Sequence, residues 1–208
     1  MKVKKVEILF TGIIAVSDKP VPIDISSIVE KLKGIIEIPL NVGTTVDGKT
    51  TIVSSPRSQI DIIQNQSRLQ VRDNSGLEPG QKPLPKVIAD TLKQLEFGCV
   101  AYGFNYDLLI SLESTNPPGE IIRDKFLNTS KLKIRTPSAV VGAAVKVRYS
   151  DKSTISNLLL DTHGSPGSER FHVNLNVHWD AKQLPVPSAL SKSFKDRHRG
   201  LIMLLKSW

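Results

Sequence analysis

The 208-residue sequence contains a single cysteine, Cys99. One thiol cannot form a disulfide within the chain, and it cannot supply the several thiolates of a structural zinc or iron–sulfur site. A chain without disulfides is typical of a reducing compartment, so the sequence predicts a cytoplasmic protein. The four histidines match no metal-ligating motif, and we expect neither a metal nor another cofactor.

The sequence also lacks long apolar runs, and only 5% of its residues are aromatic. No uncharged apolar stretch reaches the roughly 18 residues of a membrane-crossing helix, so we expect no membrane partner. Glycine and proline, 13 of each, follow no fixed period, and no heptad pattern is sustained, which excludes collagen-like and coiled-coil chains. Apolar residues nevertheless recur throughout, which predicts a single compact domain over residues 1–208.

The net charge is +8, and positive charge is concentrated in two segments. Residues 181–208 carry a net charge of +5 and residues 121–148 carry +6, so the rest of the chain is slightly acidic. Such clusters attract anionic partners, nucleic acids among them, but they also occur on ordinary solvated surfaces. Charge alone leaves both interpretations open.

The spacing of apolar residues predicts alternating strands and helices in the first half of the chain. Residues 5–17 alternate as a strand, and Asp24 is placed to cap a helix that ends near Gly34. Asp47-Gly48 marks a hairpin between residues 44–46 and 49–53, and a second hairpin joins residues 58–63 to residues 68–72. After a polar loop, Pro85 suits the first turn of a second helix.

The second half repeats this order of elements. A long strand over residues 102–112 precedes a short helix near residues 121–126. Further strands are predicted over residues 131–135, 140–149, 155–161 and 170–180. Ser188 is placed to cap a final helix, whose continuity Gly200 puts in question.

This order predicts an α+β fold in which a mostly antiparallel, curved sheet is backed by helices. Each half, residues 1–97 and 98–208, reads as strand, helix, about four strands and helix, which suggests duplication of a β-α-β4-α unit. The element order resembles that of the TATA-binding-protein fold, in which two such units form one curved antiparallel sheet backed by helices. The resemblance is one of topology and rests on no shared motif.

Residues 43–50 match the phosphate-loop pattern G-x-x-x-x-G-K-T, with Gly43, Gly48, Lys49 and Thr50 at its fixed positions. A working phosphate loop needs a helix to begin at the Lys-Thr pair, so that backbone N–H groups point at the phosphates. The β-branched residues after Thr50 favour a strand instead, and Pro56 would interrupt a short helix. A P-loop nucleotide hydrolase therefore remains only a minor alternative.

Polar and apolar residues alternate over residues 170–180, and the polar face carries His172, Asn174, Asn176, His178 and Asp180. His172 and His178 are roughly 20 Å apart along a strand, so they cannot bind one metal ion together. No nucleophile and base fall at a spacing that predicts a catalytic site, which favours a protein without enzymatic activity.

Two sets of residues are candidates for binding a partner. Lys192, Lys195 and Arg199 recur at spacings of three and four on the final helix, and Arg197 extends that basic surface. The second set lies on the polar faces of predicted strands and comprises Arg68, Arg72, Lys146, Arg148, Asn174 and Asn176. These residue types contact phosphates and the minor groove of nucleic acids.

The sequence thus favours a non-catalytic intracellular binding protein that uses an exposed polar sheet face, a basic C-terminal helix, or both. Nucleic-acid binding is the principal alternative, and the partner is not identified by any motif. An exposed sheet edge would also permit homo-oligomerisation, since unpaired strand edges invite pairing.

Overall fold

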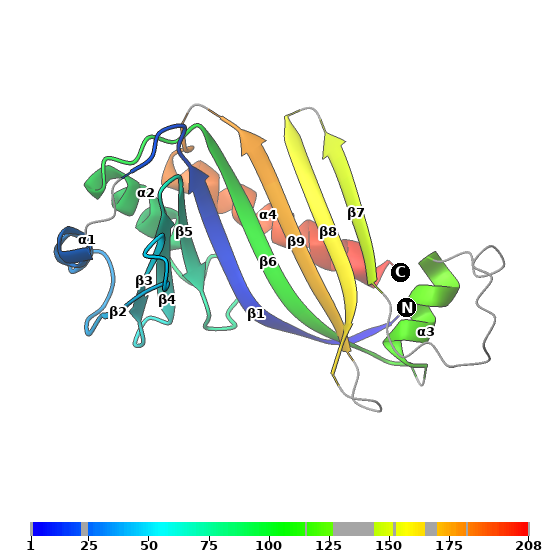
Figure 1. Cartoon of the computed structure of the whole chain (residues 1–208). Helices are drawn as coiled ribbons and strands as arrows, with labels where there is room; N and C mark the ends of the chain where they lie inside the picture. The colour runs from blue at the N-terminus through cyan, green and yellow to red at the C-terminus, as the bar shows by residue number, and fades with distance from the viewer. Residues whose placement is uncertain are drawn as a thin grey trace.

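A computed structural model describes residues 2–21, 25–114, 116–126, 144–151, 153–164, 170–181 and 183–207. Within these residues, nine strands form one sheet in the order β2-β3-β4-β5-β1-β6-β9-β8-β7, and every neighbouring pair is antiparallel (Figure 1). The strands are β1 (Val3–Val16), β2 (Asn41–Thr44), β3 (Thr50–Ser55), β4 (Ile60–Asn65), β5 (Arg68–Asp73), β6 (Ala101–Leu112), β7 (Ala144–Asp151), β8 (Thr154–His163) and β9 (Arg170–Asp180). The prediction of an α+β fold with an antiparallel sheet is confirmed.

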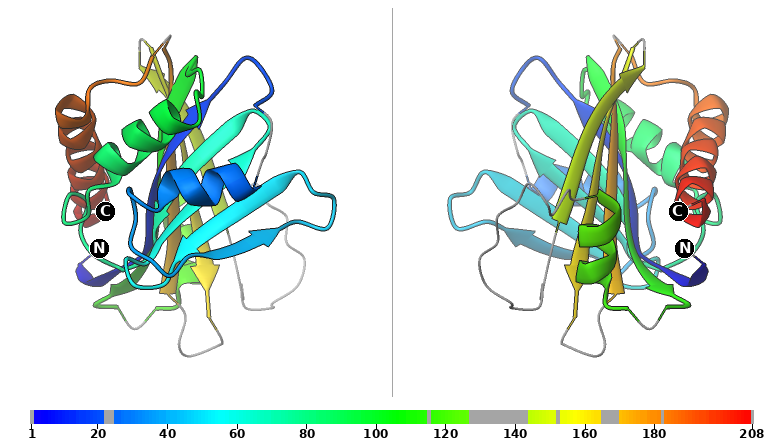
Figure 2. Two further views of the ribbon diagram at one scale, coloured as in Figure 1. Left: turned by 90° about the vertical axis from the view of Figure 1, so that its left-hand side faces the viewer. Right: turned by 90° about the vertical axis from the view of Figure 1, so that its right-hand side faces the viewer.

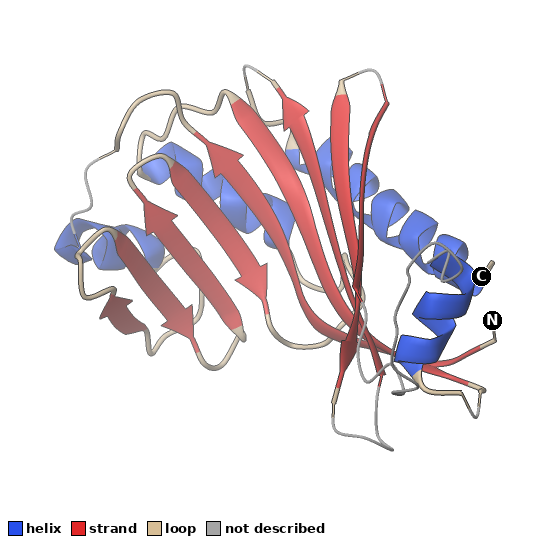
Figure 3. Ribbon diagram, turned by 45° about the vertical axis from the view of Figure 1, so that its right-hand side comes forward, coloured by secondary structure: helices blue, strands red, loops and turns tan. Residues whose placement is uncertain are grey.

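Three of the four described helices lie on one face of this sheet. These are α1 (Ile25–Leu32), α2 (Leu84–Gln94) and α4 (Pro187–Lys206), all of which lie behind the strands in Figure 3. The short helix α3 (Pro118–Phe126) lies beside the β7 end of the sheet (Figure 1). The side views show that the sheet is twisted and curved, and that α2 and α4 cover only one of its faces (Figure 2). The opposite face has no described helix over its central strands.

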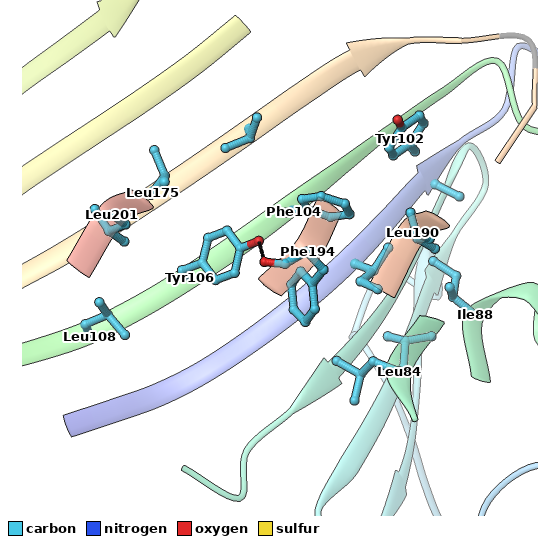
Figure 4. Close-up of a cluster of buried hydrophobic side chains, with 14 of the residues drawn as sticks. Leu84, Ile88, Tyr102, Phe104, Tyr106, Leu108, Leu175, Leu190, Phe194 and Leu201 are labelled. Atoms are coloured by element: carbon cyan, nitrogen blue, oxygen red, sulfur yellow. Dashed lines mark hydrogen bonds between the residues drawn. The ribbon is translucent and has the colours of Figure 1, made fainter. Parts of the chain in front are cut away.

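The core lies between the sheet and α2 and α4. Strand alternation sends Ile13, Phe104 and Val177 of neighbouring strands into it, all of them fully buried. Phe194 of α4 packs against Phe104 with 5.1 Å between ring centroids (Figure 4). The Tyr106 hydroxyl donates a 2.6 Å hydrogen bond to the Phe194 carbonyl oxygen, and this bond fixes the position of α4 over β6.

The long helix α4 begins two residues earlier than it would if Ser188 were its N-cap. Its N-cap is Val186, which makes no side-chain capping bond, and Pro187 occupies the first turn, where a missing N–H costs nothing. The prediction that Ser188 caps the helix is therefore wrong. The helix also continues through Gly200, because the buried side chains of Phe194, Leu201 and Leu205 hold both of its halves against the sheet.

Two predicted features lie outside the described residues, namely the helix cap at Asp24 and the strand over residues 131–135. The remaining strands form within a few residues of their expected bounds, and residues 140–143 of the strand predicted over 140–149 also lie outside the described residues. None of the described helices combines the length and the apolar character needed to cross a membrane.

Candidate binding surface on the open face of the sheet

The face of the sheet opposite α2 and α4 is called the open face here. The register brings six of its residues into one row across six neighbouring strands: Arg72 of β5, Gly12 of β1, Asn105 of β6, Asn176 of β9, Asn157 of β8 and Arg148 of β7. Neighbouring strands lie about 4.8 Å apart, so this central row spans roughly 24 Å. An arginine stands at each end and three asparagines occupy the middle.

The three asparagines offer both hydrogen-bond donors and acceptors. Asn176 donates its side-chain amide to the Asn105 side-chain oxygen, and Asn157 lies directly across from Asn176 on the next strand. All three side chains are half-buried. Each amide has more hydrogen-bonding capacity than this one contact uses, so the middle of the central row can still bond to a ligand.

A carboxylate lies beside the central row and is almost covered. Asp107 of β6 is 7% exposed, and its Oδ1 lies 2.8 Å from His172 Nε2. Asn174 donates a second bond of 2.8 Å to the other carboxylate oxygen. We call Asp107, His172 and Asn174 the Asp107 cluster. Its three side chains hold one another in place before any ligand arrives.

The sequence analysis did not identify Asp107, although a signal was present. The buried side of β6 carries large apolar residues at alternate positions, among them Phe104, Tyr106 and Leu108. Asp107 falls between them, on the side that the alternation assigns to the open face. What the sequence could not supply is the register, which places Asp107 directly opposite Asn174 and next to His172 on β9.

Two pairs of opposite charges on the open face form salt bridges. Arg72 Nη2 lies 2.7 Å from the Asp61 Oδ2, which also accepts a bond from Asn74, and Arg170 Nη1 lies 2.9 Å from Glu7 Oε2. Burial raises the pKa of Asp61, but the hydrogen bonds from Ser54, Arg72 and Asn74 outweigh it and hold the pKa below its ordinary value.

The predicted basic residues on strands differ in whether their side chains have bonding partners. Arg72 is paired, and Arg68 donates a hydrogen bond to Gln70. Lys146 and Arg148 on β7 are exposed and form no salt bridge with any residue in the described parts of the chain. The strongest free positive charge on the open face thus lies at its β7 margin.

The structure separates the two predicted sets of binding residues. Lys192, Lys195 and Arg199 are exposed on the side of α4 that faces away from the sheet, so they lie on the opposite surface from the open face. Arg199 lies 3.6 Å from Asp196. Arg197, the fourth residue of the predicted helix set, is half-buried, and its guanidinium lies 5.5 Å from the centre of the Trp179 ring.

The sequence match to a phosphate loop forms the turn of the β2–β3 hairpin. Gly43 lies in β2 and Thr50 begins β3, while Gly48 adopts a φ of 66°, which glycine accepts without strain. The Thr45 hydroxyl donates to Asp47, whose carboxylate also accepts a bond from the Lys49 N–H. No helix begins at Lys49, so this segment lacks the anion-binding geometry of a phosphate loop.

Metal and nucleophile chemistry receives no support from the described side chains. No group of three histidine, cysteine, aspartate or glutamate residues among them converges to hold a metal ion. Cys99 is half-buried; burial raises its pKa, and its thiol donates a 3.3 Å bond to the Ala101 carbonyl. A protonated thiol of this kind is a poor nucleophile.

No protein-family model matches the chain, and no curated protein is significantly similar to it. Functional inference therefore rests on the geometry of the open face and its margins.

Proposed function

We propose that this protein is a non-catalytic binding protein and that the open face receives its partner. The observation that carries the proposal is the Asp107 cluster together with the asparagines of the central row. These groups form a pre-arranged hydrogen-bonding surface on a sheet face that has no described helix over its central strands. A surface whose side chains are already held in place loses little conformational entropy when it binds.

The composition of the open face defines the chemistry of a suitable ligand. Asp107, Asp61 and Glu7 already have protein partners, while the asparagine amides retain unused donors and acceptors. The ligand is thus expected to be polar and extended, and to make hydrogen bonds across several strands.

We also propose that residues 1–97 and 98–208 are two copies of one folding unit, as the resemblance to the TATA-binding-protein fold implies. Two features support this. The first strands of the halves, β1 and β6, pair with each other at the centre of the sheet. The last strand of each half, β5 or β9, pairs with the first strand of the same half and is followed by a helix, α2 or α4.

Affinity capture from an extract of cells that express the protein tests the binding proposal. The wild type is compared with Gln70→Glu/Asn157→Glu on the open face and with Lys192→Glu/Arg199→Glu on the outer side of α4. The open-face variant is expected to lose the partners that the wild type retains, and the α4 variant is expected to keep them. If the wild type and the open-face variant retain the same partners in equal amounts, the proposal is contradicted.

Nucleic acid is the second candidate ligand, and the two ends of the central row favour it. Arg72 and Arg148 flank the amides of Asn105, Asn176 and Asn157 at a span comparable with the width of a duplex. Arginines at the margins would contact phosphates, and asparagine amides between them would contact base edges in a minor groove.

The salt dependence of binding to labelled duplex DNA and RNA, measured by fluorescence anisotropy, tests this candidate. The logarithm of the binding constant is expected to fall linearly with the logarithm of the salt concentration, and Arg148→Gln is expected to reduce the slope by about one. Absence of binding at low salt would exclude nucleic acid while leaving the binding proposal standing. Unchanged affinity in Lys192→Glu/Arg199→Glu would exclude a contribution from the outer side of α4.

A further inference from the structure

Among the strands that the structure describes, β7 is the outermost at its end of the sheet. It pairs with β8 along its whole length, and no strand in the described parts of the chain pairs with its other edge. All of its residues except Val145 are exposed. Such an edge presents a row of backbone N–H and C=O groups that another extended segment can pair with.

The two faces of β7 differ in chemistry. Lys146 and Arg148 project onto the open face, in register with Leu159 and Asn157 of β8. Val147 and Tyr149 project onto the opposite, helix-covered face, where they are 45% and 44% exposed. The edge therefore carries cations on one side and uncovered apolar surface on the other.

A groove of about 390 Å³ continues this apolar side between the sheet and α4. Tyr149, Leu175 and Val177 line it from the strands, and Leu204 and Gly200 line it from the helix. The charged residues Asp196 and Arg197 of α4 also line the groove. Leu204 is 39% exposed, and the absent side chain of Gly200 leaves open space in the groove wall. Apolar side chains of a segment paired with β7 would point into this groove.

We propose that β7 binds an extended acidic segment of a partner protein, which adds a strand to the sheet. The main chain of the segment pairs with the free edge, and its side chains alternate between the two faces. Acidic residues lie opposite Lys146 and Arg148, and apolar residues lie opposite Val147 and Tyr149. Directly opposite side chains have Cβ atoms about 5 Å apart, which suits both ion pairs and apolar contacts.

The charges on β7 disfavour a second copy of this chain as the occupant. In an antiparallel pair of two β7 strands centred on Val147, Lys146 of each copy faces Arg148 of the other. A pair centred on Arg148 places two arginines opposite each other. Like charges directly opposite destabilise strand pairing, whereas carboxylates at these positions would stabilise it.

Fluorescence polarisation with a labelled peptide that contains the core Val-Glu-Val-Glu-Val tests the proposal on the full chain. The matched peptide replaces both glutamates with lysines. Wild-type protein is expected to bind the glutamate peptide at least about tenfold more tightly, and Lys146→Glu/Arg148→Glu is expected to reverse the preference. The control variant Lys192→Glu/Arg199→Glu has the same change of net charge and is expected to keep the wild-type preference.

Two further measurements separate strand addition from charge attraction alone. Methylation of alternate backbone nitrogens, so that the methyl groups face β7, is expected to abolish binding, while methylation of the other nitrogens is not. Hydrogen exchange of the β7 amides that point away from β8 is expected to be fast in the free monomer and slowed by the peptide.

Several results would overturn the proposal. They are equal binding of both peptides, no binding of either peptide, no effect of backbone methylation, and slow exchange of the outward-pointing β7 amides in the free protein. Slow exchange in a monomer would mean that the chain itself covers the edge, and slow exchange in a dimer would mean that a second copy covers it. Each of these results leaves the proposal for the open face intact, because the capture experiment alters Gln70 and Asn157 and not β7.

Discussion

His172 Nε2 lies 2.8 Å from Asp107 Oδ1, although the two residues are 65 positions apart in the sequence. The antiparallel register of β6 and β9 brings them together, and Asn174 occupies the second oxygen of the same carboxylate. Removal of a nearly buried carboxylate with both oxygens bonded is expected to lower the free energy of unfolding, because both of its partners, His172 and Asn174, lose a bond. The Asp107 cluster is therefore both a structural element of the open face and the centre of the proposed binding surface.

Asp107→Ala is expected to lower the free energy of unfolding by about 1–3 kcal/mol, because His172 and Asn174 lose their shared acceptor. Urea denaturation measures the change. The matched control is Asp180→Ala, which removes a carboxylate that is exposed and bonded only to exposed His178, with an expected change within about 0.5 kcal/mol. Equal losses in the two variants would show that the Asp107 cluster does not stabilise the sheet.

Two glycine-to-alanine substitutions are expected to have effects of opposite sign. A Cβ at Gly103 would lie 2.7 Å from the Val177 carbonyl oxygen, so Gly103→Ala must force β6 and β9 apart at a cost of about 1–3 kcal/mol. Gly200 has nothing within 4 Å of the Cβ position and lies inside a helix, so Gly200→Ala is expected to stabilise the protein by about 0.5–1 kcal/mol. Thermal unfolding distinguishes the two, and destabilisation by Gly200→Ala would show that α4 is not continuous.

The register that carries these contacts could be predicted only in part. Alternation along residues 102–112 and 170–180 identified which side chains share a face, and the two hairpins follow from their turn residues. Outside the hairpins, however, sequence spacing contains no information on which strands become neighbours. The pairing of β1 with β6 and of β6 with β9 therefore had to come from the structure, and so did the Asp107 cluster.

The basic surface of α4 could also be predicted from the sequence only in part. Helical spacing placed Lys192, Lys195 and Arg199 opposite the apolar side of α4, but it could not show that α4 lies on the face of the sheet opposite the open face. Arg197 was assigned to the same surface, yet it lies on the flank of the helix above Trp179. Local periodicity shows which side of a helix faces the core, but the face of the sheet on which the helix packs depends on the tertiary fold.

Stability is expected to decline as the pH falls below about 6.5, the ordinary pKa of histidine. Burial lowers the pKa of His198, and the Glu78 carboxylate 3.1 Å from its Nδ1 opposes this only in part. At pH values below 6.5 the unfolded chain binds a proton that folded His198 resists, so unfolding becomes easier as the pH falls.

Urea denaturation at a series of pH values between 5 and 8 checks this expectation. His198→Leu removes the titrating group and is expected to flatten the profile over the acid part of the range. Glu78→Gln removes the opposing carboxylate, so the loss of stability in acid is expected to be larger than in the wild type. If the stability of the wild type and of His198→Leu changes with pH at the same slope, His198 does not cause the loss of stability in acid.

Tyr106→Phe is expected to lower the free energy of unfolding by about 0.5–1.5 kcal/mol, because it removes the buried bond to the Phe194 carbonyl. Tyr149→Phe makes the same chemical change at an exposed position and is expected to have no measurable effect. Chemical denaturation of both variants gives the comparison. If Tyr106→Phe lowers the free energy of unfolding no more than Tyr149→Phe does, the bond from Tyr106 to Phe194 does not hold α4 on the sheet.

Site-specific photo-crosslinking in cells tests the binding proposal most directly. A benzophenone amino acid replaces Asn157 on the open face in one variant and Lys192 on the outer side of α4 in the other. Irradiation is expected to yield a discrete crosslinked adduct from position 157 and none from position 192. An adduct from position 192 with none from position 157 would mean that partners bind the helical side of the molecule and not the exposed strands.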